Sequence, residues 1–214
     1  PAPAYREIVD EDWMAAWKKF YHPILIGEKL LILPAWMPSI EPERIAIKID
    51  PSMAFGTGTH PTTQLCLAMV EKYVVPHQDI IDMGCGSGIL SIGALLLGAR
   101  HALGVDIDNE SMQSSRENAE NNGVADRLEL FKGTIQEILN GACSIRQAPL
   151  VTANILTPIL IQLFDQGMAD LITPGGVILL SGILEEQDEK IRNAAKAQGL
   201  EFLEKRQIAD WVAY

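Results

Sequence analysis

From residue 79 onward the sequence alternates between short apolar runs and longer segments with helical periodicity. Each short run is apolar along most of its length, which is typical of strands buried on both faces. Strands that alternate with helices form a parallel sheet covered by helices on both sides, so the sequence predicts an α/β fold. The predicted strands cover residues 79–83, 101–106, 127–131, 150–153 and 177–181, and the predicted helices cover 61–73, 90–97, 110–121, 158–171 and 185–198.

The chain ahead of this alternation has a different organisation. A helical pattern and a strand pattern are separated from the next strand by a proline-rich segment, residues 34–42. We therefore predict a linker helix and lead-in strand over residues 1–43, followed by one domain over residues 44–214. The elements expected outside the alternation are a helix at 10–20 and strands at 29–33, 44–49, 201–206 and 210–214.

The strongest chemical signal is DMGCGSG, residues 82–88, where the first strand of the alternation ends and its helix begins. Alternating glycines let the backbone turn sharply and approach a ligand, and the N-terminus of the helix offers N–H groups to an anion. A nicotinamide fingerprint would place its third glycine at position 89, which is isoleucine. The pattern predicts a ligand that carries a carboxylate or phosphate; a tight turn without a ligand is the alternative.

A second signal follows the next predicted strand, in the sequence GVDID at residues 104–108. Asp106 lies about 20 positions after the first glycine, where a carboxylate typically accepts hydrogen bonds from ribose hydroxyls. The alternative role is to cap the following helix, and Asp108 is better placed than Asp106 for that role.

A third signal is the loop DPSMAFGTGTHPTT, residues 50–63, which directly precedes a helical run. Pro61 suits the first turn of that helix because its φ is fixed and it lacks an N–H group. Gly56 and Gly58 would let the loop fold over a ligand as a lid. His60 fits a capping or packing role better than acid–base catalysis.

Taken together, these stretches resemble a known family. The order Asp-x-Gly-x-Gly-x-Gly, followed by an acid after the next strand, is similar to the Rossmann-like methyltransferases that use S-adenosylmethionine. With AFGTGTHPTT at residues 54–63 and ANIL at residues 153–156, the chain closely resembles the bacterial lysine methyltransferases of large-subunit ribosomal protein eleven. The resemblance implies a class I methyltransferase fold, with a mostly parallel seven-stranded sheet, and S-adenosylmethionine as the cofactor.

The resemblance also implies which residues form the site. Asn154 stands where related amine and amide methyltransferases have an Asn-Pro-Pro-aromatic motif that orients the target nitrogen. Residues 155–157 of this chain, Ile-Leu-Thr, replace the prolines and the aromatic residue, which suits an aliphatic amine. Asn154 is therefore the implied catalytic residue, although contact with the cofactor alone is an alternative. The implied cofactor contacts are Phe55, Thr63, Gly84, Cys85, Gly86, Asp106, Ile107 and Asn154.

Charge and composition restrict the partners. The formal charge of −11 disfavours a surface that holds nucleic acid and favours a basic protein or a small molecule. Three cysteines without a Cys-x-x-Cys pair indicate neither a disulfide framework nor a zinc site. No apolar run reaches the ~18 residues of a membrane-spanning helix, and the first residues do not show a basic-then-apolar signal pattern. We expect a cytoplasmic enzyme without a metal, and ribosomal protein eleven as its partner.

Rival functions remain open at this stage. The domain could methylate another protein or a small-molecule amine, because motifs specify the cofactor half of such domains better than the acceptor half. It could also bind S-adenosylmethionine without catalysis, as a sensor or scaffold. A nicotinamide-dependent oxidoreductase is the weakest alternative because of the glycine spacing.

Overall fold

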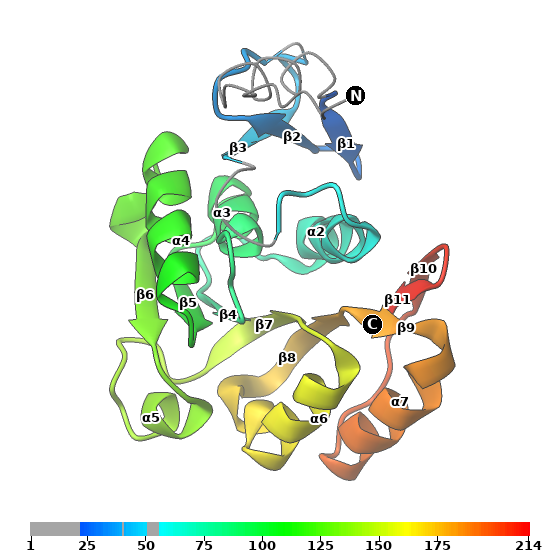
Figure 1. Cartoon of the computed structure of the whole chain (residues 1–214). Helices are drawn as coiled ribbons and strands as arrows, with labels where there is room; N and C mark the ends of the chain where they lie inside the picture. The colour runs from blue at the N-terminus through cyan, green and yellow to red at the C-terminus, as the bar shows by residue number, and fades with distance from the viewer. Residues whose placement is uncertain (1–21, 40, 51–55) are drawn as a thin grey trace, which may run out of the picture.

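The computed structural model describes residues 22–39, 41–50 and 56–214 (Figure 1). The helix predicted over residues 10–20 lies outside these residues. Figure 1 shows a central sheet with helices on both sides, and a smaller sheet at the top of the view that contains the first described strands. The predicted α/β class is confirmed.

The central sheet consists of five parallel strands. Across the sheet they are β6 (Leu128–Lys132), β5 (Ala102–Asp106), β4 (Ile80–Met83), β7 (Ala148–Asn154) and β8 (Ile172–Ser181). The chain runs from β4 through β5 to β6 at one edge and then returns to place β7 on the other side of β4. In open α/β sheets, ligands bind beyond the carboxyl ends of the strands at such a reversal.

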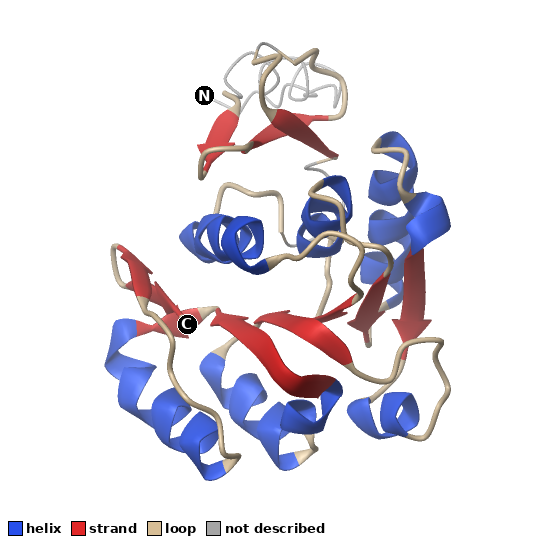
Figure 2. Ribbon diagram, turned by 180° about the vertical axis from the view of Figure 1, so that it is seen from behind, coloured by secondary structure: helices blue, strands red, loops and turns tan. Residues whose placement is uncertain are grey.

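Both faces of this sheet are buried, as the apolar strand sequences predict. Consecutive residues of β4 reach opposite faces, so Ile80 and Ile81 belong to two separate apolar clusters. Figure 2 shows the helices on either side of the strands. One face is covered by α2 (Pro61–Tyr73), α3 (Ile89–Leu96) and α4 (Asn109–Asn121), and the other by α5 (Ile135–Leu139), α6 (Thr157–Asp165) and α7 (Asp188–Ala197).

The last strands extend the central sheet in the antiparallel direction. β11 (Trp211–Ala213) lies between β10 (Arg206–Ile208) and β9 (Ile183–Leu184) in a small sheet. Tyr214 continues β11 and exchanges two backbone hydrogen bonds of 2.9 Å with Leu180 of β8. The parallel sheet therefore has five strands among the described residues, and the seven-stranded prediction is matched only when β11 and β10 are counted with it.

One predicted strand is displaced along the sequence. The strand expected at 201–206 is found at β10, which pairs with β11 so that Ile208 lies opposite Trp211. The two-residue turn between them has Ala209 at φ 49°. The turn geometry, rather than the apolar pattern, sets where this hairpin begins.

The lead-in strands form their own sheet over α2 and α3. β1 (Ile24–Ile26) pairs antiparallel with β2 (Leu30–Pro34), which pairs parallel with β3 (Ile45–Ile49). The Glu71 carboxylate of α2 accepts the N–H groups of the β1–β2 turn, at 2.8 and 3.0 Å. The predicted boundary between residues 43 and 44 passes between the paired strands β2 and β3, and it stays a prediction.

Candidate active site

A cavity of about 750 Å³ lies beyond the carboxyl ends of β4, β5 and β7, at the point where the strand order reverses. The ends of these strands, the first turns of α6, His60 and Trp211 line it. Five of the predicted site residues line this cavity: Gly84, Gly86, Asp106, Ile107 and Asn154. Phe55, which we predicted as a wall beside the cofactor, lies outside the described residues.

The glycine turn connects β4 to α3 through a backbone with positive φ angles, which residues other than glycine adopt at a cost in free energy. Gly84, Gly86 and Gly88 have φ values of 66°, 54° and 77°. Gly88 is the N-cap of α3 and makes no side-chain capping bond. The turn therefore brings backbone close to the cavity at the start of a helix, while the N–H groups of Gly84 and Gly86 donate to Val105 O and Asp106, at 2.8 and 3.0 Å.

Cys85, between two of these glycines, is not among the residues that line the cavity. It is buried, its Sγ lies 3.6 Å from the Ser115 hydroxyl, and burial raises the pKa of the thiol. Its predicted role as a cofactor contact stays a prediction.

The acid that precedes the glycine turn, Asp82, is a buried support rather than a lining residue. Its carboxylate accepts hydrogen bonds from Ser91 Oγ at 2.8 Å, Ser91 N at 3.2 Å and Thr152 Oγ1 at 2.7 Å. Burial raises the pKa of Asp82 to about 6 despite these three donors. The carboxylate thus ties β4, β7 and the first turn of α3 together directly beneath the cavity.

The raised pKa predicts a pH dependence of stability. Folded Asp82 holds its proton more tightly than the unfolded chain, so its contribution to the free energy of unfolding is largest below pH 4 and falls as the pH rises through 6. Relative to Asp82→Asn, which mimics the protonated form, the free energy of unfolding of the wild-type protein should fall by roughly 2 kcal/mol between pH 4 and pH 7. Urea denaturation across this range measures the difference, with Asp126→Asn, which removes an exposed carboxylate, as the control. A constant difference would contradict the prediction.

Asp106, at the end of β5, is held by backbone donors. One carboxylate oxygen accepts the N–H of Gly86 at 3.0 Å, and the other accepts those of Ile107 at 2.8 Å and Asp108 at 3.1 Å. The carboxylate is thereby fixed at the cavity wall, beside an Ile107 side chain that is 78% exposed. The capping role belongs to Asp108, whose side chain accepts from Ser111 N at the start of α4.

Asn154, the last residue of β7, carries an unsatisfied buried atom. Its Nδ2 lies 3.4 Å from Thr63 Oγ1, while its Oδ1 is buried and has no hydrogen-bond partner among the described residues. An unpaired buried acceptor is costly unless a ligand donates to it. Thr63 is fully buried behind Asn154 and supports it; as a direct cofactor contact Thr63 stays a prediction.

His60 caps the helix that follows the glycine-rich loop. Its Nδ1 accepts from Thr62 N at 3.3 Å, and Pro61 occupies the first turn of α2 as predicted. The ring also packs edge-to-face on Trp211, with the centroids 4.9 Å apart. His60 therefore joins α2 to β11 at the cavity wall.

The described part of the same loop docks on the glycine turn. The Ser87 hydroxyl donates to Gly56 O at 2.8 Å, and a Cβ built on Gly58 would lie 2.6 Å from Ile32. Both glycines have positive φ. These contacts hold residues 56 and 58 against Ser87 and Ile32, and the lid over a ligand stays a prediction.

Several lining residues were not predicted from the sequence. Gly133 and Thr134 follow β6 at the same edge of the sheet, so the end of the next predicted strand was the signal that could have identified them. Trp211 enters from the C-terminal hairpin, and no local motif marks it. A further group comes from α6 and its two cap residues: Leu156, Ile159, Gln162, Leu163 and Gln166.

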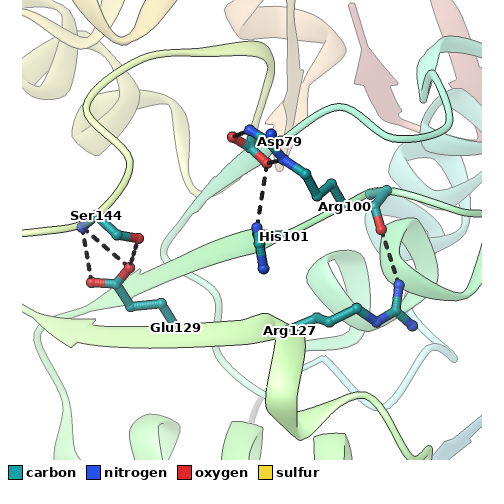
Figure 3. Close-up of polar contacts among 7 residues, drawn as sticks. Asp79, Arg100, His101, Arg127, Glu129 and Ser144 are labelled. Atoms are coloured by element: carbon teal, nitrogen blue, oxygen red, sulfur yellow. Dashed lines mark hydrogen bonds and ion pairs between the residues drawn. The ribbon is translucent and has the colours of Figure 1, made fainter.

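Charged side chains at the opposite ends of the strands serve the fold. Figure 3 shows Asp79, before β4, between Arg100 and His101, before β5. The hydrogen bond from Arg100, 2.8 Å long, lowers the pKa of Asp79. Arg127 donates to the carbonyl of Ala99 at 3.0 Å. None of these side chains lines the cavity, because the cavity lies at the carboxyl ends.

The described residues show no sign of a metal site or a membrane-spanning helix. They contain no group of three His, Cys, Asp or Glu side chains placed to hold a metal ion. No helix among them is long and apolar enough to cross a membrane.

The fold and the cavity define the class of this protein: a Rossmann-like domain with a ligand crevice at the reversal of strand order, bordered by a glycine turn, a fixed carboxylate and an asparagine. The model of one family, described as ribosomal protein L11 methyltransferase (PrmA), matches residues 2–214. The chain belongs to this family.

Relatives and solved structures agree with this assignment. Ribosomal protein L11 methyltransferases from Hahella chejuensis and Pseudomonas aeruginosa are 43% and 42% identical over 96% and 92% of this chain. The chain spans 67% and 65% of their lengths, about two thirds. A crystal structure of a ribosomal protein L11 methylase from Lactobacillus delbrueckii subsp. bulgaricus is 33% identical, with a TM-score of 0.80, over 90% of this chain and 96% of that one.

A more distant structure shows the fold alone. An RNA methyltransferase from Salinibacter ruber, solved in complex with S-adenosyl-L-homocysteine, is 21% identical, with a TM-score of 0.54, over 70% of this chain and 86% of that one.

Proposed function

We propose that this chain binds S-adenosylmethionine and transfers its methyl group to lysine or N-terminal amines of ribosomal protein L11, in the cytoplasm. The observation that carries the proposal is Asn154 Oδ1, a buried acceptor without a partner among the described residues, in the wall of a cavity that the glycine turn also lines. The net charge of −11 favours a basic protein rather than nucleic acid as the partner.

The residues present fit the proposed cofactor. The turn at Gly84 and Gly86 lets a ligand approach the start of α3 without a Cβ in the way, and Asp106 is held beside it, where it could accept from ribose hydroxyls. The exposed Ile107 side chain next to Asp106 offers an apolar surface to a base. When bound, S-adenosylmethionine supplies a methyl group on a positively charged sulfur that is itself a good leaving group.

The chain then has to position the acceptor and exclude water. Asn154 Oδ1 would accept a hydrogen bond from the acceptor nitrogen and so orient its lone pair. The apolar side chains of Ile155, Leu156 and Trp211 line the same space and would lower the pKa of a lysine amine below its usual value of about 10.4. The amine would thus enter in its neutral form, and no strong base is required.

One experiment tests cofactor and acceptor together. Labelled S-adenosylmethionine, incubated with this chain and a whole ribosomal-protein mixture, should label protein L11. S-adenosylhomocysteine should also raise the melting temperature, because a ligand that binds only the native state stabilises it. No calorimetric heat with S-adenosylhomocysteine, together with clear binding of NAD, would refute the cofactor assignment.

The role of Asp106 gives a quantitative prediction. Asp106→Asn should weaken S-adenosylhomocysteine binding by about 10-fold to 100-fold, because a charged acceptor for two hydroxyls is lost. Asp108→Asn removes the same charge two residues away and keeps a good N-cap, so its affinity should stay within about 2-fold. Titration calorimetry of both variants measures this. Equal losses in both would assign the effect to net charge and not to a ribose contact.

A further inference from the structure

The fold does not explain why position 156 is a leucine. Leu156 is the N-cap of α6, yet it makes no side-chain capping bond, and the residues favoured at an N-cap are Ser, Thr, Asp and Asn. Its side chain does not fill the core either, because it is 61% exposed. An exposed leucine at a position that favours a polar residue indicates a role outside helix stability and core packing.

Ile159 lies in the same turn and has the same character. Its N–H donates to Leu156 O at 2.9 Å, and its side chain is 43% exposed. Both side chains line the cavity, and Leu156 follows Asn154 by only two residues. We call Leu156 and Ile159 together the apolar rim.

The chemistry of the rim fits one part of an acceptor. A nitrogen placed at Asn154 has to be carried there by a chain that passes the cavity wall. Branched aliphatic side chains pack well against a methylene chain and offer it no hydrogen bonds, and lysine presents such a stem below its amine.

We propose that the apolar rim binds the methylene stem of the acceptor lysine and so favours lysine over the N-terminal amines that the proposed function also allows. The inference rests on the proposed function and assigns the rim to the acceptor rather than to the cofactor. Ile107, which is also exposed, lies at a different strand end, beside Asp106.

The test separates acceptor binding from cofactor binding. Leu156→Gln and Ile159→Gln should each raise the KM for ribosomal protein L11 by about 10-fold, because the apolar contact with the stem is lost. The affinity for S-adenosylhomocysteine should stay within about 2-fold, because the rim does not contact the cofactor in this proposal. Leu203→Gln is the matched control: Leu203 is 66% exposed but does not line the cavity, and its KM should equal that of the wild type.

A second variant distinguishes a ligand role from a structural one. Leu156→Asn places a residue that is favoured at an N-cap, so its melting temperature should not fall below that of the wild type while its KM rises. Peptides with lysine or with 2,3-diaminopropionate, whose stem is shorter, test the stem itself. Wild type should prefer lysine, and both rim variants should lose part of that preference.

Each outcome supports or overturns the inference. If the wild type is active and both rim variants keep its KM, this inference is overturned and the proposed function is not. Weaker S-adenosylhomocysteine binding at unchanged KM assigns the rim to the cofactor and also overturns it. Absence of any methyl transfer by the wild type overturns the proposed function, and this inference falls with it.

Discussion

Replacing Asn154 with alanine is expected to slow methyl transfer by about 100-fold or more, the usual cost of losing one oriented hydrogen-bonding group at a reacting centre. Its Oδ1, which has no hydrogen-bond partner in the described part of the chain, is the atom that would orient the acceptor nitrogen. The affinity for S-adenosylhomocysteine should fall by at most about 10-fold, because the glycine turn and Asp106 remain. Initial rates at saturating cofactor, together with titration calorimetry, measure the two effects separately.

Thr63→Val is the companion variant to Asn154→Ala. It keeps the shape of a fully buried side chain and removes only the hydroxyl that lies 3.4 Å from Asn154 Nδ2. We expect a rate reduced by about 5-fold to 10-fold, because Asn154 would be less well oriented.

Equal losses of rate and cofactor affinity in Asn154→Ala would make Asn154 a cofactor contact alone.

Gly182→Ala is expected to destabilise the protein by about 3 kcal/mol or more and to abolish methyl transfer. Gly182 has φ 83°, and a Cβ there would lie 2.5 Å from Ile155 O and 2.7 Å from Ile155 C. The clash is with backbone, which cannot rotate away, and it adds to the left-handed strain of about 1–2 kcal/mol. Because Ile155 follows Asn154, any shift of that backbone also displaces the site.

A matched glycine, Gly123, separates the effect of the backbone clash from the effect of the left-handed strain. Gly123 has φ 66°, and a Cβ there would meet nothing within 4 Å. Gly123→Ala should therefore cost only the conformational strain, about 1–2 kcal/mol, with the activity retained. Urea denaturation and methyl-transfer rates of both variants test this. Similar stability losses in the two variants would show that the Ile155 backbone yields without cost.

The central sheet could be predicted from the sequence because its strands are buried on both faces. Apolar runs mark β4, β5 and β7 without any need for alternation, and Pro61 marks the start of α2. Shorter elements gave no comparable signal. α5 has five residues, too few for a helical period, and its capping box at Thr134 and Glu137 was the only local cue.

The residues of the candidate site also fall into those that the sequence predicts and those that depend on tertiary packing. Gly84, Asp106 and Asn154 follow predicted strands, and the parallel topology alone brings their strand ends to one edge. Trp211 comes from a hairpin at the other end of the chain, and its place beside His60 depends on tertiary packing. The burial of Thr63 also follows from packing, since a threonine in a loop motif could equally face a ligand.

The carboxylate of Asp106 bonds to the N–H of Gly86 across two neighbouring strand ends. The part of the cavity that suits a sugar and the part that suits a carboxylate are therefore not independent receptors. A ligand group that pulls on Asp106 also moves the glycine turn, and a group seated in that turn fixes Asp106 in advance. Binding at the two halves is thus thermodynamically linked, so the free energies of two ligand fragments would not simply add to that of the whole molecule.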